Sequence, residues 1–140
     1  MSGRTFLINP VVPTGTTGFF VPQTSVGIGS GGTAYIAPWS AYGGGFANGW
    51  TYHRDGLVVV DALIKCTGAN FTQDVIRFLP VPVAGVLLMH FVATVGASIY
   101  NTRFDLDARG AVVFNGISGF PNGSAIDFVP LNFAYQAAVP

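Results

Sequence analysis

The sequence predicts an all-β protein, an antiparallel β-sandwich or barrel with an extended, glycine-rich N-terminal arm. First, 19 Gly and 9 Pro interrupt the chain so often that the longest stretch free of both is the 13 residues from Ala97 to Arg109. Second, Glu is absent and Lys occurs once, whereas Gly and Pro cost about 1 and about 3 kcal/mol inside a helix. Third, short runs rich in Val, Ile, Phe and Tyr are separated by Gly, Asn and Pro, which is typical of sandwiches and barrels.

The first 49 residues are expected to form the arm. From Thr5 to His53 no side chain carries a formal charge, yet the segment is rich in aromatic residues as well as glycine. Glycine disfavours regular structure and aromatic rings disfavour solvation, the opposite of the composition of a disordered tail. We therefore expect the arm to become ordered against a neighbouring subunit; the side chains assigned to this assembly role are Phe6, Phe19, Phe20 and Trp39. The alternative is that the segment folds back as edge strands on its own domain.

Residues 50–140 are expected to form the β-sandwich module. Leu57–Lys65 is a nearly continuous apolar run, as in a strand that is buried on both faces for much of its length. Val75–Leu79 is expected to be a short strand that stops at the following prolines, because proline donates no hydrogen bond to a ladder. Val86–Val95 is the most apolar strand, and we expect it to be buried in the core or between protomers; the residues assigned to this role are Leu87, Met89, His90 and Phe91.

The strands nearer the C-terminus show one-sided patterns. Apolar and polar residues alternate over Tyr100–Leu106, so one face should be buried and the other should contact water. Gly110 is expected to supply a positive φ in a hairpin turn that leads into a strand at Ala111–Phe114. A last strand is expected around Ile126–Phe133, where Pro130 must bend the strand or lie at an edge.

The residues that usually carry catalytic or metal chemistry are few and scattered. His53 and His90 lie 37 residues apart, and with no Glu in the chain they provide no metal-ligand spacing. Cys66 has no nucleophile signature around it and is expected to be a buried thiol. We therefore predict that the protein is not an enzyme and that it holds no cofactor and no metal.

Three further features have both a functional and a structural interpretation. Asp105 and Asp107 lie beside Arg103 and Arg109, and surface ion pairs are favoured over half of a calcium site. The run Gly27–Gly32 lacks the helix and the Lys of a phosphate loop, so it is interpreted as a hinge. Four aromatic side chains are candidates for a sugar-stacking platform, although packing at a subunit interface explains them equally well: Trp39, Tyr42, Trp50 and Tyr52.

The balance of charge limits the classes of partner. Six basic and six acidic residues cancel, and charged residues make up 9% of the chain, against about 25% in an ordinary soluble domain. Nucleic-acid binding depends on a basic surface and is not expected. Val81–Tyr100 carries no formal charge, but Pro82 and Gly96 interrupt it, so we expect a buried strand and no membrane insertion. So few charges also repel sister copies weakly, which favours an assembly component over a free monomer.

Residues 48–133 contain a series of short motifs: Asn48-Gly49-Trp50, Arg54-Asp55-Gly56-Leu57-Val58, Phe78-Leu79-Pro80, Phe104-Asp105-Leu106-Asp107, Arg109-Gly110-Ala111 and Ile126-Asp127-Phe128. Together they resemble the β-barrel module at the tips of tailed-bacteriophage fibres and receptor-binding proteins. In that family a Gly-Trp pair precedes a strand that begins with Gly, a Leu-Pro pair ends a strand, and a Gly-Val hairpin follows. The positions that carry the resemblance are Trp50, Gly56, Leu79, Pro80 and Gly110.

The resemblance implies a homotrimeric β-module on a virion. Together with the composition, it leads us to expect a phage virion structural protein that attaches to the capsid or tail through its arm, with other virion proteins as partners. Capsid decoration and a tail fibre stay open, as does a role in host adsorption by binding a host-surface glycan. The alternative is a stand-alone carbohydrate-binding, lectin-like module. Residues 1–20 contain no apolar leader, so we expect synthesis in the host cytoplasm and a final location in the virion.

Overall fold

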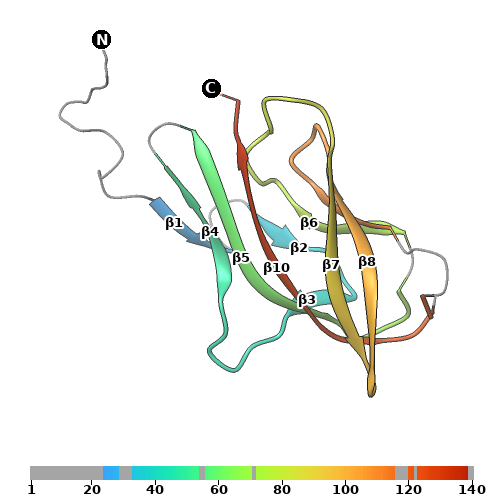
Figure 1. Ribbon diagram of the computed structural model, residues 1–140. Helices are drawn as coiled ribbons and strands as arrows, with labels where there is room; N and C mark the ends of the chain where they lie inside the picture. The colour runs from blue at the N-terminus through green and yellow to red at the C-terminus, as the bar shows by residue number, and fades with distance from the viewer. Residues whose placement is uncertain are drawn as a thin grey trace, which may run out of the picture.

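The protein is all-β and antiparallel, as predicted (Figure 1). The computed structural model describes residues 24–28, 33–53, 56–70, 72–115, 120–121 and 123–138, and within them it contains no helix. Phe6, Phe19 and Phe20 of the expected arm lie outside the described residues. The strands are β1 (Thr24–Gly27), β2 (Ala34–Tyr35), β3 (Trp39–Ala41), β4 (Asn48–Tyr52), β5 (Leu57–Cys66), β6 (Gln73–Arg77), β7 (Leu87–Val95), β8 (Ser98–Leu106), β9 (Val112–Asn115) and β10 (Ile126–Gln136).

The ten strands form one sheet that curls until it is nearly closed into a barrel. Its order is β1-β4-β5-β10-β7-β8-β9-β6-β2, and β3 also pairs with β5. β2 and β3 follow each other in the chain, so one short segment pairs first with β6 at one end of the sheet order and then with β5. The Ile36 N–H donates to the Val75 carbonyl at 2.9 Å, and the Thr67 N–H donates to the Pro38 carbonyl at 3.1 Å. The segment between β2 and β3 is therefore hydrogen-bonded to both sides of the barrel.

Trp39 lies in the core of its own barrel and not in an assembly arm. It is 2% exposed, and its ring lies 5.8 Å from that of Phe104 and 5.2 Å from that of Phe114, between centroids. The second half of the expected arm, from residue 33 to residue 49, thus belongs to the sheet, as the fold-back alternative proposed. The physical reason is that β5 and β6 each have backbone N–H and C=O groups at a free edge. This uncharged segment can hydrogen-bond to both edges while it buries the Trp39 indole in the core.

Alternation along the strands separates the barrel interior from its outer face. On β5, Val58, Val60, Ala62, Ile64 and Cys66 are buried, whereas the residues between them are half-buried or exposed, so the prediction of burial on both faces was too strong. On β8, Thr102, Phe104 and Leu106 are buried while Asn101 is exposed, which confirms the predicted one-sided strand.

The apolar strand β7 is not buried on both faces. Met89 and Ala93 are buried, Leu87 and Phe91 are half-buried and pack against the core, and Leu88 is 59% exposed. His90, which we expected to be interior or at an interface, is exposed on the outer face. In a barrel of one sheet layer each strand has a single face towards the core, so an uncharged outer face does not indicate burial.

Pro130 lies inside β10 and not at an edge of the sheet. β10 pairs with β5 along its length, including a Pro130–Leu63 pair, with a register shift between Ile126 and Val129. On its other side the register between the described strands β10 and β7 consists of the Phe128–Thr94 pair. Proline donates no N–H, so its position fits a stretch where β10 pairs on one side only.

Gly110 occupies a turn in which a side chain has no room. Its φ is +80°, as predicted, and a Cβ there would overlap the carbonyl oxygen of Leu79, whose N–H donates to the Gly110 carbonyl at 3.0 Å. Gly96, in the turn between β7 and β8, has a φ of +61° but nothing within 4 Å of a built Cβ. Substitutions at these two glycines therefore distinguish the cost of backbone strain from the cost of steric overlap.

We predict that Gly110→Ala lowers the free energy of unfolding by more than about 3 kcal/mol, and that Gly96→Ala lowers it by about 1 kcal/mol. Both variants carry the cost of a positive φ, but only Gly110→Ala must also displace Leu79. Urea denaturation of the two variants and the parent chain measures the difference. Equal losses in the two variants would contradict the close approach of Leu79 to Gly110.

Candidate functional site

Most of the residues that carry the family resemblance hold turns and packing contacts at one end of the barrel. Gly56 has a φ of +89° and lies against Gln136 at the end of β10. Leu79 is buried beside Gly110, and the Pro80 carbonyl accepts a hydrogen bond of 2.6 Å from the Tyr135 hydroxyl. Each of these contacts fixes the path of the chain.

The expected sugar-stacking platform does not form from the two tryptophans. Trp39 is in the core, and Trp50 on β4 pairs with Val60, whose side chain points into the barrel. The indole Nε1 atoms of Trp39 and Trp50 are both buried without a hydrogen-bond partner among the described residues. Tyr52 is half-buried and packs against the core, so Tyr42 alone of the four is exposed. The tryptophans are thus structural.

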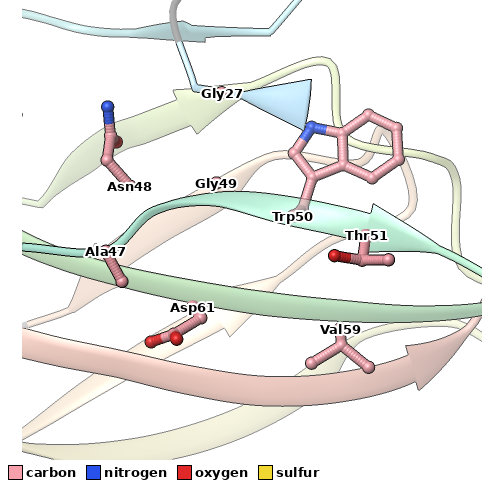
Figure 2. A pocket seen from close by; sticks show the side chains of 8 residues that line it. All are labelled: Gly27, Ala47, Asn48, Gly49, Trp50, Thr51, Val59 and Asp61. Carbon is pink, nitrogen blue, oxygen red and sulfur yellow. The ribbon is translucent and has the colours of Figure 1, made fainter. Parts of the chain in front are cut away.

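A shallow pocket of about 440 Å³ lies on β4 and β5 (Figure 2). Gly27 and Gly49 form part of its lining, and Gly49 pairs with Asp61 across the strands. Figure 2 shows Trp50 and Asn48 on one side of the β4 ribbon, and Thr51 with Asp61 on the other. The pocket therefore presents the Asp61 carboxylate beside small residues, with the indole turned away from it.

Asn48 is committed to structural hydrogen bonds at the edge of this pocket. Its Oδ1 accepts a bond of 2.5 Å from the Tyr35 hydroxyl, and its Nδ2 donates to the Ile28 carbonyl at 3.4 Å. Burial raises the pKa of Tyr35, so this hydroxyl stays protonated and remains a donor. Asp61 is then the single titratable group in the lining, which provides no acid–base pair for catalysis.

The histidines and the cysteine do not meet in one place. Cys66 is buried, its Sγ donates to the Gly68 carbonyl at 3.4 Å, and burial raises the pKa of its thiol. His90 pairs with Arg103 on the outer face, whereas His53 follows β4. Within the described part of the chain, no group of three or more His, Cys, Asp or Glu side chains is placed to hold a metal ion.

The charged side chains on β6 and β8 and in the turn before β9 are largely paired with one another. Arg103 binds Asp105 through two hydrogen bonds of 2.9 and 3.0 Å, as predicted for a surface pair. Asp74 accepts hydrogen bonds from Arg109 at 3.0 and 3.1 Å and from Arg77 at 2.8 Å. The hydrogen bonds from Arg109 hold the pKa of the Asp74 carboxyl below its usual value. This side of the barrel therefore presents little uncompensated charge.

Exposed apolar side chains are concentrated in one stretch of the chain. Within the described residues, six of the nine large exposed apolar side chains lie between residues 78 and 92: Phe78, Val81, Val83, Val86, Leu88 and Val92. We call this set the apolar surface. It spans the loop between β6 and β7 and the outer face of β7, and Phe78 within it has a φ of +67°, a conformation that costs a non-glycine residue energy.

The sequence identified this strand, and the residues it assigned to the interface or core fall on both faces: Leu87, Met89 and Phe91 face the core, whereas His90 lies on the outer face. Among the residues assigned to the interface or core, Met89 points inward and Phe91 contacts the Phe104 ring at 5.8 Å between centroids. Leu88 and Val92, which are available to a partner, were not singled out. The alternation of side chains along a strand indicates that Leu88 and Val92 share one face of β7. Because the run is apolar on both faces, the sequence does not show which face points outward.

No protein-family model, curated protein or solved structure matches the chain. The resemblance to phage fibre-tip modules therefore stays a prediction. Among the described residues there is also no helix that is long and apolar enough to span a membrane.

We predict that Asp74→Asn lowers the free energy of unfolding by about 0.5–1 kcal/mol at pH 7, and that this loss disappears in acid. The pKa of Asp74 is lower in the folded protein, so its stabilising effect is present above the unfolded value of about 3.9 and is lost as the pH falls through the folded value. Urea denaturation between pH 7 and pH 2 measures the difference between the variant and the parent chain.

Asp61→Asn is the matched control, because Asp61 makes no ion pair with any described residue. At pH 7 it should lower the free energy of unfolding by less than Asp74→Asn does, because it removes no ion pair. A loss for Asp74→Asn that is as large at pH 2 as at pH 7 would contradict the role given to the ion pairs of Asp74.

Proposed function

We propose that the protein is a structural subunit that associates with sister copies and forms part of a larger particle. The observation that carries the proposal is the apolar surface, which leaves Phe78 67% exposed and Leu88 59% exposed. These side chains follow one another along the β6–β7 loop and β7, and exposed apolar patches on a small protein mark interaction surfaces. The resemblance to fibre-tip modules favours a phage virion as the particle and a trimer as the assembly.

A second copy of the chain is the occupant that the charge distribution supports. On the strand next to β7, Arg103 is neutralised by Asp105, and on β6 Asp74 is bound by Arg77 and Arg109. The surroundings of the apolar surface therefore favour neither a polyanion nor a strongly basic partner. A sister copy presents the same apolar, nearly neutral surface, and three such surfaces can meet around the three-fold axis of a trimer.

Attachment to the rest of the particle is assigned to the N-terminal residues 1–23. They contain one formal charge, at Arg4, together with Phe6, Phe19 and Phe20, and they lead into β1. β1 is the outermost strand of the sheet on that side, so the chain enters the barrel at an edge. The proposal gives the protein no catalytic role; the buried Cys66 and the separation of the histidines support this part of it.

The test is the molar mass of the full chain in solution, measured by light scattering during gel filtration. The parent chain is expected to run as an oligomer at about 100 μM. Its dissociation constant is then below this concentration, so the free energy of association is stronger than about −5.5 kcal/mol. A double variant, Val83→Asp with Leu88→Asp, places two carboxylates on the apolar surface and is expected to run as a monomer.

Ile99→Asp is the matched control, because Ile99 is also an exposed apolar residue on the β7–β8 pair but lies beside its turn. This variant is expected to keep the mass of the parent. A monomeric parent chain at about 100 μM would overturn the proposal. So would a parent oligomer that stays intact in the double variant.

A further inference from the structure

A second pocket, of about 480 Å³, lies at the end of the barrel away from the loop that carries Phe78. It is lined by the end of β5, the start of β10 and Tyr42. Tyr42 is the centre of an aromatic cluster: its ring lies 5.6 Å from that of Phe46 and 5.9 Å from that of Phe128, both edge to face. Phe46 is 58% exposed and Tyr42 is 39% exposed, so this cluster is open to solvent.

Three consecutive glycines place Phe46 against Tyr42. Gly43, Gly44 and Gly45 have φ values of +88°, +66° and +82°, which side-chain-bearing residues rarely adopt. The turn is closed by the Phe46 N–H, which donates to the Gly43 carbonyl at 3.3 Å. The backbone therefore holds an exposed phenyl ring in a defined position and does not leave it on a random loop.

A bulge at the start of β10 supplies one wall of the pocket itself, whereas Phe46 adjoins the pocket through its contact with Tyr42. Ile126 and Val129 both point inward, and the register with β5 shifts between them. Two residues, Asp127 and Phe128, are thus placed on the outer face where a regular strand would place one. Asp127 is fixed by the Gly96 N–H, which donates to its Oδ2 at 2.9 Å.

The pocket combines aromatic rings with one cation, one anion and the hydroxyl groups of Tyr42 and Thr67. The Lys65 Nζ lies 5.9 Å from the centroid of the Tyr42 ring, within the range of a cation–π contact. The Asp127 carboxylate and the exposed Thr67 also line the pocket. Lys65 and Asp127 have opposite charges, so the lining as a whole favours neither a cationic nor an anionic ligand.

We infer that this pocket binds a neutral saccharide. A sugar ring presents an apolar C–H face to an aromatic ring and hydroxyl groups at its rim, which both donate and accept hydrogen bonds. The cluster around Tyr42 matches the first property, and Lys65 with Asp127 matches the second. The inference deepens the proposed function, because it gives the assembled particle a ligand class, but the binding site lies within one chain and does not need the assembly.

The test is saturation-transfer difference NMR on the full chain, with maltose, cellobiose, lactose and chitobiose as neutral probes. At least one disaccharide is expected to receive saturation from the protein, with a dissociation constant of about 1 mM, as suits an open pocket with few contacts. Phe46→Ala is expected to weaken that binding at least tenfold, which corresponds to about 1.4 kcal/mol. Lys65→Met keeps the apolar stem, removes the cation, and is expected to weaken binding similarly.

Ile99→Ala is the matched control, because Ile99 is an exposed apolar residue that neither lines the pocket nor belongs to the apolar surface. It should bind the sugar as the parent chain does. The inference is overturned if no probe receives saturation, if Phe46→Ala and Lys65→Met both bind normally, or if Ile99→Ala weakens binding as much as they do. Such a failure would leave the molar mass of the parent chain unchanged, so it is distinguishable from a failure of the assembly.

Discussion

Closure of the barrel by the segment from β2 to β3 is the constraint on which the rest of the structure depends. Ala34 and Tyr35 extend the ladder of β6, and four residues later Trp39 begins to pair with β5. The same turn of the chain delivers the Trp39 indole to the rings of Phe104 and Phe114, which belong to β8 and β9. One segment thus satisfies two ladder edges and fills the interior that they enclose.

Once the interior is filled in this way, the functional surfaces must lie outside. The outer face is divided along the barrel: the apolar surface lies around the β6–β7 loop and β7, and the aromatic pocket around Tyr42 lies where β10 begins. On β8, which β7 separates from β10, Arg103 and Asp105 neutralise each other. The two surfaces differ in chemistry, because the first has no charged member and the second includes Lys65 and Asp127. This difference supports the two roles proposed here, association with sister copies and sugar binding.

The sequence was sufficient for features that depend on local patterns. The all-β class followed from glycine and proline, the one-sided burial of β8 from its alternation, the turn at Gly110 from its residue type, and the Arg103–Asp105 pair from spacing along one strand. These features involve residues that are near each other in the chain, so propensity and periodicity determine them.

The features that sequence reasoning missed depend on pairing between distant segments. Nothing local distinguishes a Trp39 that docks on a neighbour from one that packs under its own β8, because both uses need an uncharged aromatic segment. In the same way, the outward side of β7 is set by its register with β8, and the pocket at Tyr42 by a register shift in β10. A one-residue shift of register exchanges the two faces of a strand, so composition alone cannot assign them.

Hydrogen exchange of the backbone amides, followed by NMR, tests the closure of the barrel most directly. The Ile36, Trp39 and Tyr42 N–H groups donate to the carbonyls of Val75, Ile36 and Leu63 respectively, so they should exchange as slowly as the amides in the middle of β5, through global unfolding. If these three amides exchange at the rate of an unstructured chain while β5 and β8 stay protected, the segment is a detachable arm and the barrel does not depend on it.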